Sequence, residues 1–284
     1  MTEPAPFCAG ISIAEALDGR RVALPPSETR ILLGHVLKLT RVQMITQSER
    51  RLNPEEAVRM TALCRRRLAG EPIAYLIGER EFYGLALHVD SSVLIPRPET
   101  ELLVELALRH LPSGGSVLDM GTGSGAIAVA VAHARPDAAV TALDLSDAAL
   151  RTAQRNAARH GARVSFLRSD WFDALAGKRF DLIVSNPPYI AAGDRHLSEG
   201  DLRFEPPNAL TDHADGLQAL RLLAREAPHH LESGGRLLME HGYDQAERVR
   251  ALLDVAGFDA VESWRDLAGI ERVTGGRFIH AAPV

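Results

Sequence analysis

The run Asn186-Pro187-Pro188-Tyr189 has the chemistry to bind a planar amide group at the end of a strand. It directly follows residues 180–185, a short apolar segment that predicts a buried parallel strand. Proline cannot donate a hydrogen bond to a sheet, so a rigid polar turn should end the strand here. Because α/β sheets bind ligands at the carboxyl ends of their strands, this turn is a candidate binding site. An ordinary strand-ending turn has a similar composition.

The chemistry of this turn suits a weak nitrogen nucleophile. An NH2 group next to C=O or C=N attacks poorly because its lone pair is delocalised. The side-chain oxygen of Asn186 and the carbonyl of Pro187 could accept its two N–H bonds. These acceptors would favour the form that keeps the lone pair on nitrogen, and Tyr189 could stack on the planar group. No general base is needed, since no proton must leave before the attack.

A glycine-rich loop at residues 121–125 follows the first strand of the same region. Its glycines permit positive φ and a close approach of a ligand to the backbone. Asp144 ends the next predicted strand, 19 residues after Gly125, where an acid can accept both hydroxyls of a ribose. The pattern also fits a dinucleotide-binding loop, or a turn that only packs a strand against a helix.

Asp170-Trp171 ends the third predicted strand of this region. Trp171 could lie against an adenine ring and Asp170 could accept from its amine, although Trp171 alone would be assigned to the core. If the strand order reverses between the first and fourth strands, the glycine loop and the Asn186 turn become neighbours. A nucleoside-bearing cofactor would then lie over the first three strands, with its reactive group toward Asn186.

The elements around these motifs predict three parts. Residues 1–75 show helical patterns only, and residues 76–98 predict a β-hairpin with strands at 81–89 and 93–95 and a turn at Asp90-Ser91-Ser92. Residues 99–284 alternate strands and helices, ending in short strands at 261–264 and 277–280. Repeated strand–helix units predict an α/β fold with a doubly wound, mostly parallel sheet.

The composition is that of an ordinary globular protein of 284 residues, 46% hydrophobic and 24% charged. No segment resembles a membrane span or a signal peptide, so a cytoplasmic protein without a membrane partner is expected. The two cysteines, Cys8 and Cys64, lack metal-ligand spacing, so no metal is expected. The net charge is −5, with −8 on residues 76–284, which argues against binding nucleic acid directly through its phosphates.

Together, these motifs resemble those of seven-stranded S-adenosylmethionine-dependent methyltransferases. The resemblance covers nearly the whole chain, and with the helical first part it narrows to the peptide-chain release factor glutamine methyltransferases. Three further segments carry it: Phe82-Tyr83-Gly84, residues 95–101, and Arg203-Phe204-Glu205-Pro206. It implies methyl transfer to the side-chain nitrogen, N(5), of the glutamine in the Gly-Gly-Gln loop of class I release factors. S-adenosyl-L-methionine would be converted to S-adenosyl-L-homocysteine.

The resemblance also implies roles for individual residues. The catalytic residues would be Asn186, Pro187 and Tyr189, and Pro188 would complete the glutamine pocket. The cofactor would contact Gly121, Thr122, Gly123, Ser124, Gly125, Asp144, Asp170, Trp171 and Asn186. Arg97, Glu99 and Thr100 would border the cofactor, and residues 203–206 would shape the pocket wall. We expect a monomer whose first 75 residues recognise the body of the release factor.

Three other functions fit part of the sequence. A nucleic-acid adenine N(6)-methyltransferase uses the same amine chemistry, but would be expected to have a basic groove. A NAD-dependent oxidoreductase would account for the glycine loop and Asp144, but not for the Asn186 turn. A non-catalytic binding protein would not need a full set of acceptors.

Overall fold

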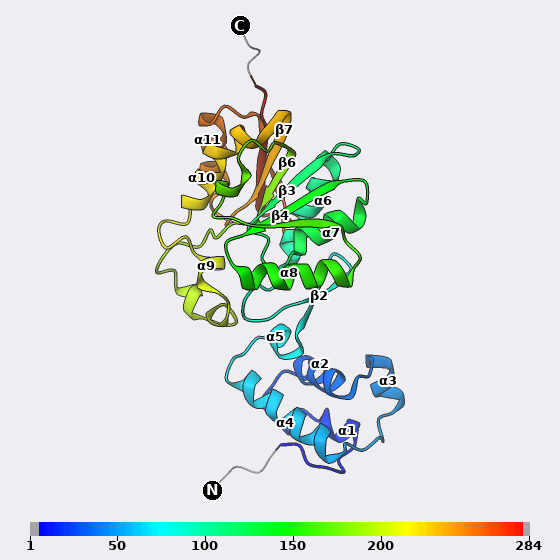
Figure 1. The fold of residues 1–284 in the computed structure, drawn as a ribbon. Helices are drawn as coiled ribbons and strands as arrows, with labels where there is room; N and C mark the ends of the chain where they lie inside the picture. The colour runs from blue at the N-terminus through cyan, green and yellow to red at the C-terminus, as the bar shows by residue number, and fades with distance from the viewer. Residues whose placement is uncertain (1–5, 281–284) are drawn as a thin grey trace. The chain divides into compact units, whose positions relative to one another are not determined.

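A computed structural model describes residues 6–280 and divides the chain into two compact units, Met1–Gly78 and Glu79–Val284 (Figure 1). The division falls three residues beyond the predicted helical part, and the hairpin belongs to the second unit. The first unit has one hydrophobic core and the second unit has two.

The first unit is helical, and three of its helices begin with strong capping signals. Ser12, Thr40 and Asn53 each accept a hydrogen bond from the third residue of the following helix, and that residue's side chain bonds back to the cap. Such reciprocal caps satisfy backbone donors that a helix start leaves unpaired. The helices are α1 (Ile13–Ala16), α2 (Pro26–Leu37), α3 (Arg41–Thr46), α4 (Pro54–Leu68) and α5 (Ile73–Ile77).

The predicted hairpin exists, but its turn was placed wrongly. Strands β1 (Glu79–Phe82) and β2 (Leu85–His88) are joined by Tyr83 and Gly84, with φ of 51° and 75°. Two positive φ values give the twist that a two-residue hairpin needs, and a tyrosine in the first position hides that signal in the sequence. The predicted second strand at 93–95 is not a strand, and the Ile95 N–H donates instead to the side chain of Glu205.

The second unit is built on a seven-stranded sheet with the order β5-β4-β3-β6-β7-β9-β8. The first five strands in this order are parallel, and β9 runs antiparallel to both of its neighbours. The strands are β3 (Ser116–Met120), β4 (Ala139–Asp144), β5 (Val164–Arg168), β6 (Phe180–Ser185), β7 (Leu231–Glu240), β8 (Asp259–Arg265) and β9 (Glu271–Arg277). The predicted reversal is confirmed, because β3 pairs with β4 on one side and with β6 on the other.

The last predicted strand, 277–280, was wrong because β9 ends at Arg277. The cause is Gly275-Gly276, which weakens the strand pattern in the sequence. A Cβ at Gly275 would lie 2.4 Å from the Leu237 carbonyl oxygen, so the close approach of β7 and β9 requires glycine there.

Helices cover both faces of the sheet (Figure 1). One face packs against α6 (Glu101–His110), α7 (Ala126–Ala134) and α8 (Asp147–Arg159), and the other against α10 (Gln218–Glu226) and α11 (Ala246–Val255). Neighbouring residues Val117 and Leu118 of β3 belong to the two different cores, as strand alternation requires. Short helical segments complete the unit: α9 (Pro207–Leu210) and the 3-10 turns Pro98–Thr100, Asp173–Leu175, Arg195–Ser198, Leu202–Phe204 and Ala227–His230.

Candidate active site

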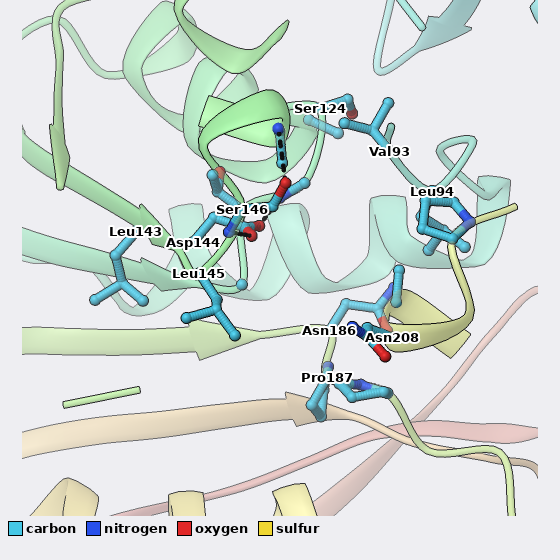
Figure 2. A pocket seen from close by; sticks show the side chains of 18 of the residues that line it. Val93, Leu94, Ser124, Leu143, Asp144, Leu145, Ser146, Asn186, Pro187 and Asn208 are labelled. Carbon is cyan, nitrogen blue, oxygen red and sulfur yellow. Dashed lines mark hydrogen bonds between the residues drawn. The ribbon is translucent and has the colours of Figure 1, made fainter. Parts of the chain in front are cut away.

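A cavity of about 530 Å³ lies at the carboxyl ends of β3, β4, β5 and β6 (Figure 2). Its walls come from six chain segments that are far apart in sequence. Most of the predicted site residues line it: Arg97, Thr100, Gly121, Thr122, Gly123, Ser124, Asp144, Asp170, Trp171, Asn186, Pro187, Pro188 and Pro206. The strand order therefore brings the glycine loop and the Asn186 turn to one cavity.

The glycine loop exposes its backbone to this cavity. Gly121 and Gly123 have φ of 74° and 54°, and a Cβ on either would meet no atom within 4 Å. The N–H groups of Gly121 and Thr122 donate to the Leu143 carbonyl at 3.0 and 2.9 Å, which holds the loop over the end of β4. Gly125 is not on the wall; a Cβ there would lie 2.9 Å from that of Ala153, so this glycine permits close packing of α7 and α8.

Asp119 anchors the loop from below. Its Oδ2 accepts from the Thr122 hydroxyl at 2.6 Å and from the Ala128 N–H at 3.1 Å, which ties β3, the loop and α7 together. Burial raises the pKa of this carboxyl to about 6, against the opposing effect of the two hydrogen bonds. Its Oδ1 has no hydrogen-bond partner among residues 6–280.

Asp144 faces the cavity, and its carboxylate oxygens can accept further hydrogen bonds. Its Oδ2 accepts from the Gly123 N–H and its Oδ1 from the Ser146 N–H, both at 2.9 Å. A carboxylate offers about four lone-pair sites, so roughly two remain for hydroxyls of a ligand. Burial raises the pKa of Asp144, and the backbone donors of Ser146 and Gly123 work against that shift.

The Asp170-Trp171 segment forms an apolar and a polar part of the wall. Trp171 is half-buried, with a φ of 46°, and packs against the core while also lining the cavity. The Ser169 hydroxyl donates a hydrogen bond to the Trp171 carbonyl at 2.7 Å. Leu145, 55% exposed, offers a second apolar side chain to the same cavity, while Asp170 is exposed. A flat aromatic ligand next to a polar rim suits these surroundings.

The Asn186 turn presents oxygen atoms to the cavity. Asn186 donates from Nδ2 to the Thr100 hydroxyl at 3.1 Å, which occupies the nitrogen end of its amide. Its Oδ1 is left to accept a hydrogen bond. No residue within 6–280 donates to the Pro187 carbonyl. Asn186 and Pro187 lie on the opposite side of the cavity from Ser146 and Leu143 (Figure 2).

Tyr189 is not where the sequence interpretation put it. It does not line the cavity; its half-buried ring packs against the core, and its hydroxyl lies 3.4 Å from Oε1 of Glu240. Burial raises the pKa of this hydroxyl. Its carbonyl accepts from Nε2 of Gln245 at 3.0 Å.

The wall at residues 203–206 is fastened by Glu205. This buried side chain forms an ion pair with Arg97 and accepts from the Ile95 N–H at 3.0 Å. Burial raises the pKa of Glu205, and Arg97 opposes that shift. Pro206 reaches the cavity wall, whereas Arg203 lies over the Phe204 ring at 5.0 Å. Glu99 is exposed and is not on the wall.

Sequence reasoning missed two polar residues behind the site. Glu240 ends β7, and Gln245 lies five residues later; both are buried, at 1% and 4% exposure. The available signal was the same one that marked Asn186: polar residues at the carboxyl end of an apolar strand, here after Leu237-Leu238-Met239. The same rule therefore applies to β7, the fifth parallel strand.

The described residues contain neither a metal-ligand cluster nor a membrane-spanning helix. Residues 6–280 contain no group of three or more His, Cys, Asp or Glu side chains placed to hold a metal ion. In the same range, no helix has both the length and the apolar character needed to cross a membrane.

Known proteins resemble this chain over most of its length. Residues 11–78 match the family model described as the PrmC N-terminal domain, and residues 98–200 match the Methyltransferase small domain. A release factor glutamine methyltransferase of Neisseria gonorrhoeae is 54% identical, covering 90% of this chain and 94% of that protein. One from Bordetella pertussis is 56% identical over 89% and 95%. A methyltransferase structure from Pyrococcus furiosus, 21% identical, shares the fold with a TM-score of 0.54 over 75% of this chain and 96% of that chain.

Proposed function

Because this chain belongs to the release factor glutamine methyltransferase family, we propose that its Asn186 turn binds the glutamine of the Gly-Gly-Gln loop of class I release factors for methylation at the side-chain nitrogen. The observation that carries the proposal is the hydrogen bond from Asn186 Nδ2 to Thr100, which leaves the amide oxygen as an acceptor beside the cavity.

The cavity suits S-adenosyl-L-methionine, which supplies an electrophilic methyl group on a sulfonium when bound. The exposed backbone of Gly121 and Gly123 admits the methionine portion, and Asp144 has acceptor sites for the ribose hydroxyls. Trp171 and Leu145 provide apolar contact for adenine, and Asp170 lies beside them on the same wall. The residues of the cavity wall therefore suit the cofactor that the family uses.

The chain's own contribution is to bind and orient the substrate nitrogen. Asn186 Oδ1 and the Pro187 carbonyl accept the two N–H bonds of the glutamine amide, which localises its lone pair. Positive charge that develops on nitrogen is stabilised by these fixed acceptors, since they need no reorganisation. The cavity walls also exclude water and hold the reacting groups close, which lowers the entropic barrier.

An Asn186→Ala variant tests this role. Turnover on purified release factor should fall by roughly 100- to 1000-fold, comparable to removing one preorganised hydrogen-bonding group. Mass spectrometry would count methyl groups on the loop glutamine, and calorimetry would check that cofactor affinity changes much less. Wild-type turnover in the variant would refute the acceptor role.

We also propose that the enzyme acts as a monomer in the cytoplasm, with residues 1–78 recognising the body of the release factor. An isolated glutamine gives little specificity, which calls for a second contact region. Light scattering during size-exclusion chromatography would test the oligomeric state.

A further inference from the structure

Asn156 is a buried amide on α8 that is not part of the cavity wall but is bonded to two segments that are. It is 0% exposed, and its side chain makes three hydrogen bonds to backbone groups. Its Oδ1 accepts from the His88 N–H at 2.7 Å. Its Nδ2 donates to the His88 carbonyl at 2.9 Å and to the Ser124 carbonyl at 2.8 Å. Both hydrogens of the amide nitrogen are therefore used within the protein.

The two bonds to His88 give strand β2 a partner on its second edge. Its first edge pairs with β1 in the two-stranded sheet. On the other edge, the Asn156 amide exchanges an N–H···O pair with a single residue, as a neighbouring antiparallel strand would. One turn further along α8, His160 Nε2 donates to the Ala86 carbonyl at 2.8 Å. The helix therefore holds β2 at two points.

The chain that leaves β2 becomes a wall of the cavity. Residues 92–94 line the cavity, and they follow a turn at Asp90 (Figure 2). The side chain of Asp90 fixes this turn, because its Oδ1 accepts from the Ser92 N–H at 2.9 Å. His88 lies two residues before the turn, so its bonds to Asn156 fix the base of this wall.

The third bond of Asn156 holds the glycine loop, which forms another wall of the same cavity. The start of the loop is held by the Leu143 carbonyl and its middle by Asp144. Asn156 holds its end, through the carbonyl of Ser124. One side chain therefore connects the glycine loop to the segment at residues 92–94.

This position needs the chemistry of asparagine. Two backbone carbonyls require donors and one backbone N–H requires an acceptor, all from one short, planar and uncharged group. An ionised aspartate has the same shape but no hydrogen to donate, and it would place a negative charge against two carbonyl oxygens. A leucine of similar size would leave three buried backbone groups unpaired, which is costly.

We propose that Asn156 is a positioning residue for cofactor binding, which fixes the glycine loop relative to the wall at residues 92–94. It acts through the backbone of Ser124 and His88 and does not itself touch the cavity. The inference rests on the proposed contact between the glycine loop and S-adenosyl-L-methionine and deepens it. A loop that binds a ligand through its backbone depends on supports of this kind, since its own side chains cannot correct its position.

The test measures cofactor binding by the full-length enzyme in the absence of release factor. Asn156→Leu keeps a similar volume and removes all three bonds, so calorimetry should show a Kd for S-adenosyl-L-methionine raised about 10-fold or more. At saturating cofactor, kcat on purified release factor should stay within about threefold of wild type, because the acceptors of the Asn186 turn are unchanged. If Asn156→Leu does not fold, Asn156→Ala decides, because it leaves room for water to bond the three backbone groups.

His160→Leu is the matched control. His160 lies on the same helix and bonds the same strand, but its partner is Ala86 and not the glycine loop. The variant should lose stability in urea unfolding while its Kd for the cofactor stays within about twofold of wild type. A purely structural role of Asn156 would produce this same pattern in the Asn156 variants.

The outcomes separate the positioning role from the cofactor site on which it rests. An unchanged Kd in a folded Asn156 variant would overturn the positioning role, and so would an equal rise in Kd in His160→Leu. Asp144→Ala removes the proposed ribose acceptor. If it raises the Kd while Asn156→Leu does not, the positioning role is wrong and the cofactor site stands. If neither variant raises the Kd, the proposed cofactor site fails first.

Discussion

The Asp144 carboxylate both binds backbone N–H groups of the protein and lines the cavity. Its bonds to the Gly123 and Ser146 N–H groups shape the glycine loop and the start of α8, while its remaining lone pairs face the cavity. Asn186 is similar, with its nitrogen end committed to Thr100 and its oxygen end available. At both residues, the protein-side bond orients the atoms left for a ligand.

Replacing Asp144 by alanine should weaken cofactor binding before it affects chemistry. Loss of two hydrogen bonds to a charged acceptor is expected to raise the Kd for S-adenosylmethionine by roughly 10- to 100-fold. Isothermal titration calorimetry measures this directly. Asp147→Ala is the matched control, because that exposed acid at the start of α8 does not line the cavity. An unchanged Kd in Asp144→Ala would contradict the ribose role.

The sequence predicted the residues on the cavity wall better than the residues that pack behind the wall. Asn186, Asp144 and the glycine loop were predictable because each follows an apolar strand, and a strand's end is a local signal. The position of the Tyr189 ring depends on its contact with Glu240 of β7, a residue distant in sequence, which no local pattern encodes. Tyr189 is not on the wall of this cavity, and its stacking on a substrate stays a prediction.

Among the elements, the segment after the Asn186 turn is held in place by backbone contacts. The Ile190 N–H donates to the Leu210 carbonyl, and the Ala192 N–H to the Ala214 carbonyl. Gln245 then joins the carbonyls of Tyr189 and Gly216 at 3.0 and 3.1 Å. These bonds link β6, the loop before α10 and the start of α11, so the turn is fixed from several elements at once.

Gly216→Ala should disturb this junction. Gly216 has a φ of 78°, and a Cβ there would lie 2.5 Å from the Tyr189 carbonyl oxygen, so the turn must shift. We expect turnover to fall at least about 10-fold, with a loss of roughly 2 kcal/mol or more in unfolding free energy, from strain plus a steric clash. Urea unfolding and steady-state kinetics measure the two effects.

Gly193→Ala is the control for Gly216→Ala. Its φ is 80°, close to that of Gly216, but a Cβ there meets no atom within 4 Å. It should show only the cost of the backbone conformation, about 1 kcal/mol, and nearly normal turnover. If the two variants behaved alike, the clash with the Tyr189 carbonyl would not be the cause.

Element positions were predictable wherever a periodic apolar pattern was long. The five parallel strands were found, whereas the hairpin turn at Tyr83-Gly84 and the strand β9 were not. Both failures involve glycine. Gly84 shares its two-residue turn with a tyrosine, which also has a positive φ. At position 275 the strand needs glycine, because the neighbouring backbone leaves no room for a side chain. These reasons appear only when the partner strand is known.

At the scale of the whole molecule, stability should depend on the ionisation of Glu240. Burial raises its pKa from 4.5 to about 7, so the folded protein keeps this proton at pH values where the unfolded chain has released it. The contribution of Glu240 to stability is therefore greatest below pH 4.5 and is lost as pH rises through about 7. Asp119 acts in the same direction over a lower range, up to about 6.

Glu240→Gln should remove this dependence. Relative to wild type, its free energy of unfolding should rise by on the order of 2 to 3 kcal/mol between pH 5 and pH 8, because it never buries a charge. Urea unfolding followed by tryptophan fluorescence would measure it, since Trp171 and Trp264 both belong to the second unit. The same difference from wild type at both pH values would contradict the shift.

Deleting residues 1–78 tests whether the first unit recognises the release factor while the second unit binds the cofactor. The remaining unit contains the whole cavity, so its cofactor affinity should be unchanged. Methylation of intact release factor should fall at least about 10-fold if a second contact region is lost, a typical effect for 1.4 kcal/mol of binding. A short peptide with the Gly-Gly-Gln sequence is the control substrate and should be methylated equally well by both forms.

The position of β9 between β7 and β8 constrains how a nascent chain can assemble. β8 is synthesised before β9 but pairs only with it, so the emerging β8 has no sheet edge to join. Until β9 arrives, β7 also keeps one row of backbone groups unpaired, directly beside Glu240. A released chain truncated between residues 265 and 271 would thus keep every residue of the cavity wall on a sheet whose β7 edge is unpaired and prone to aggregation.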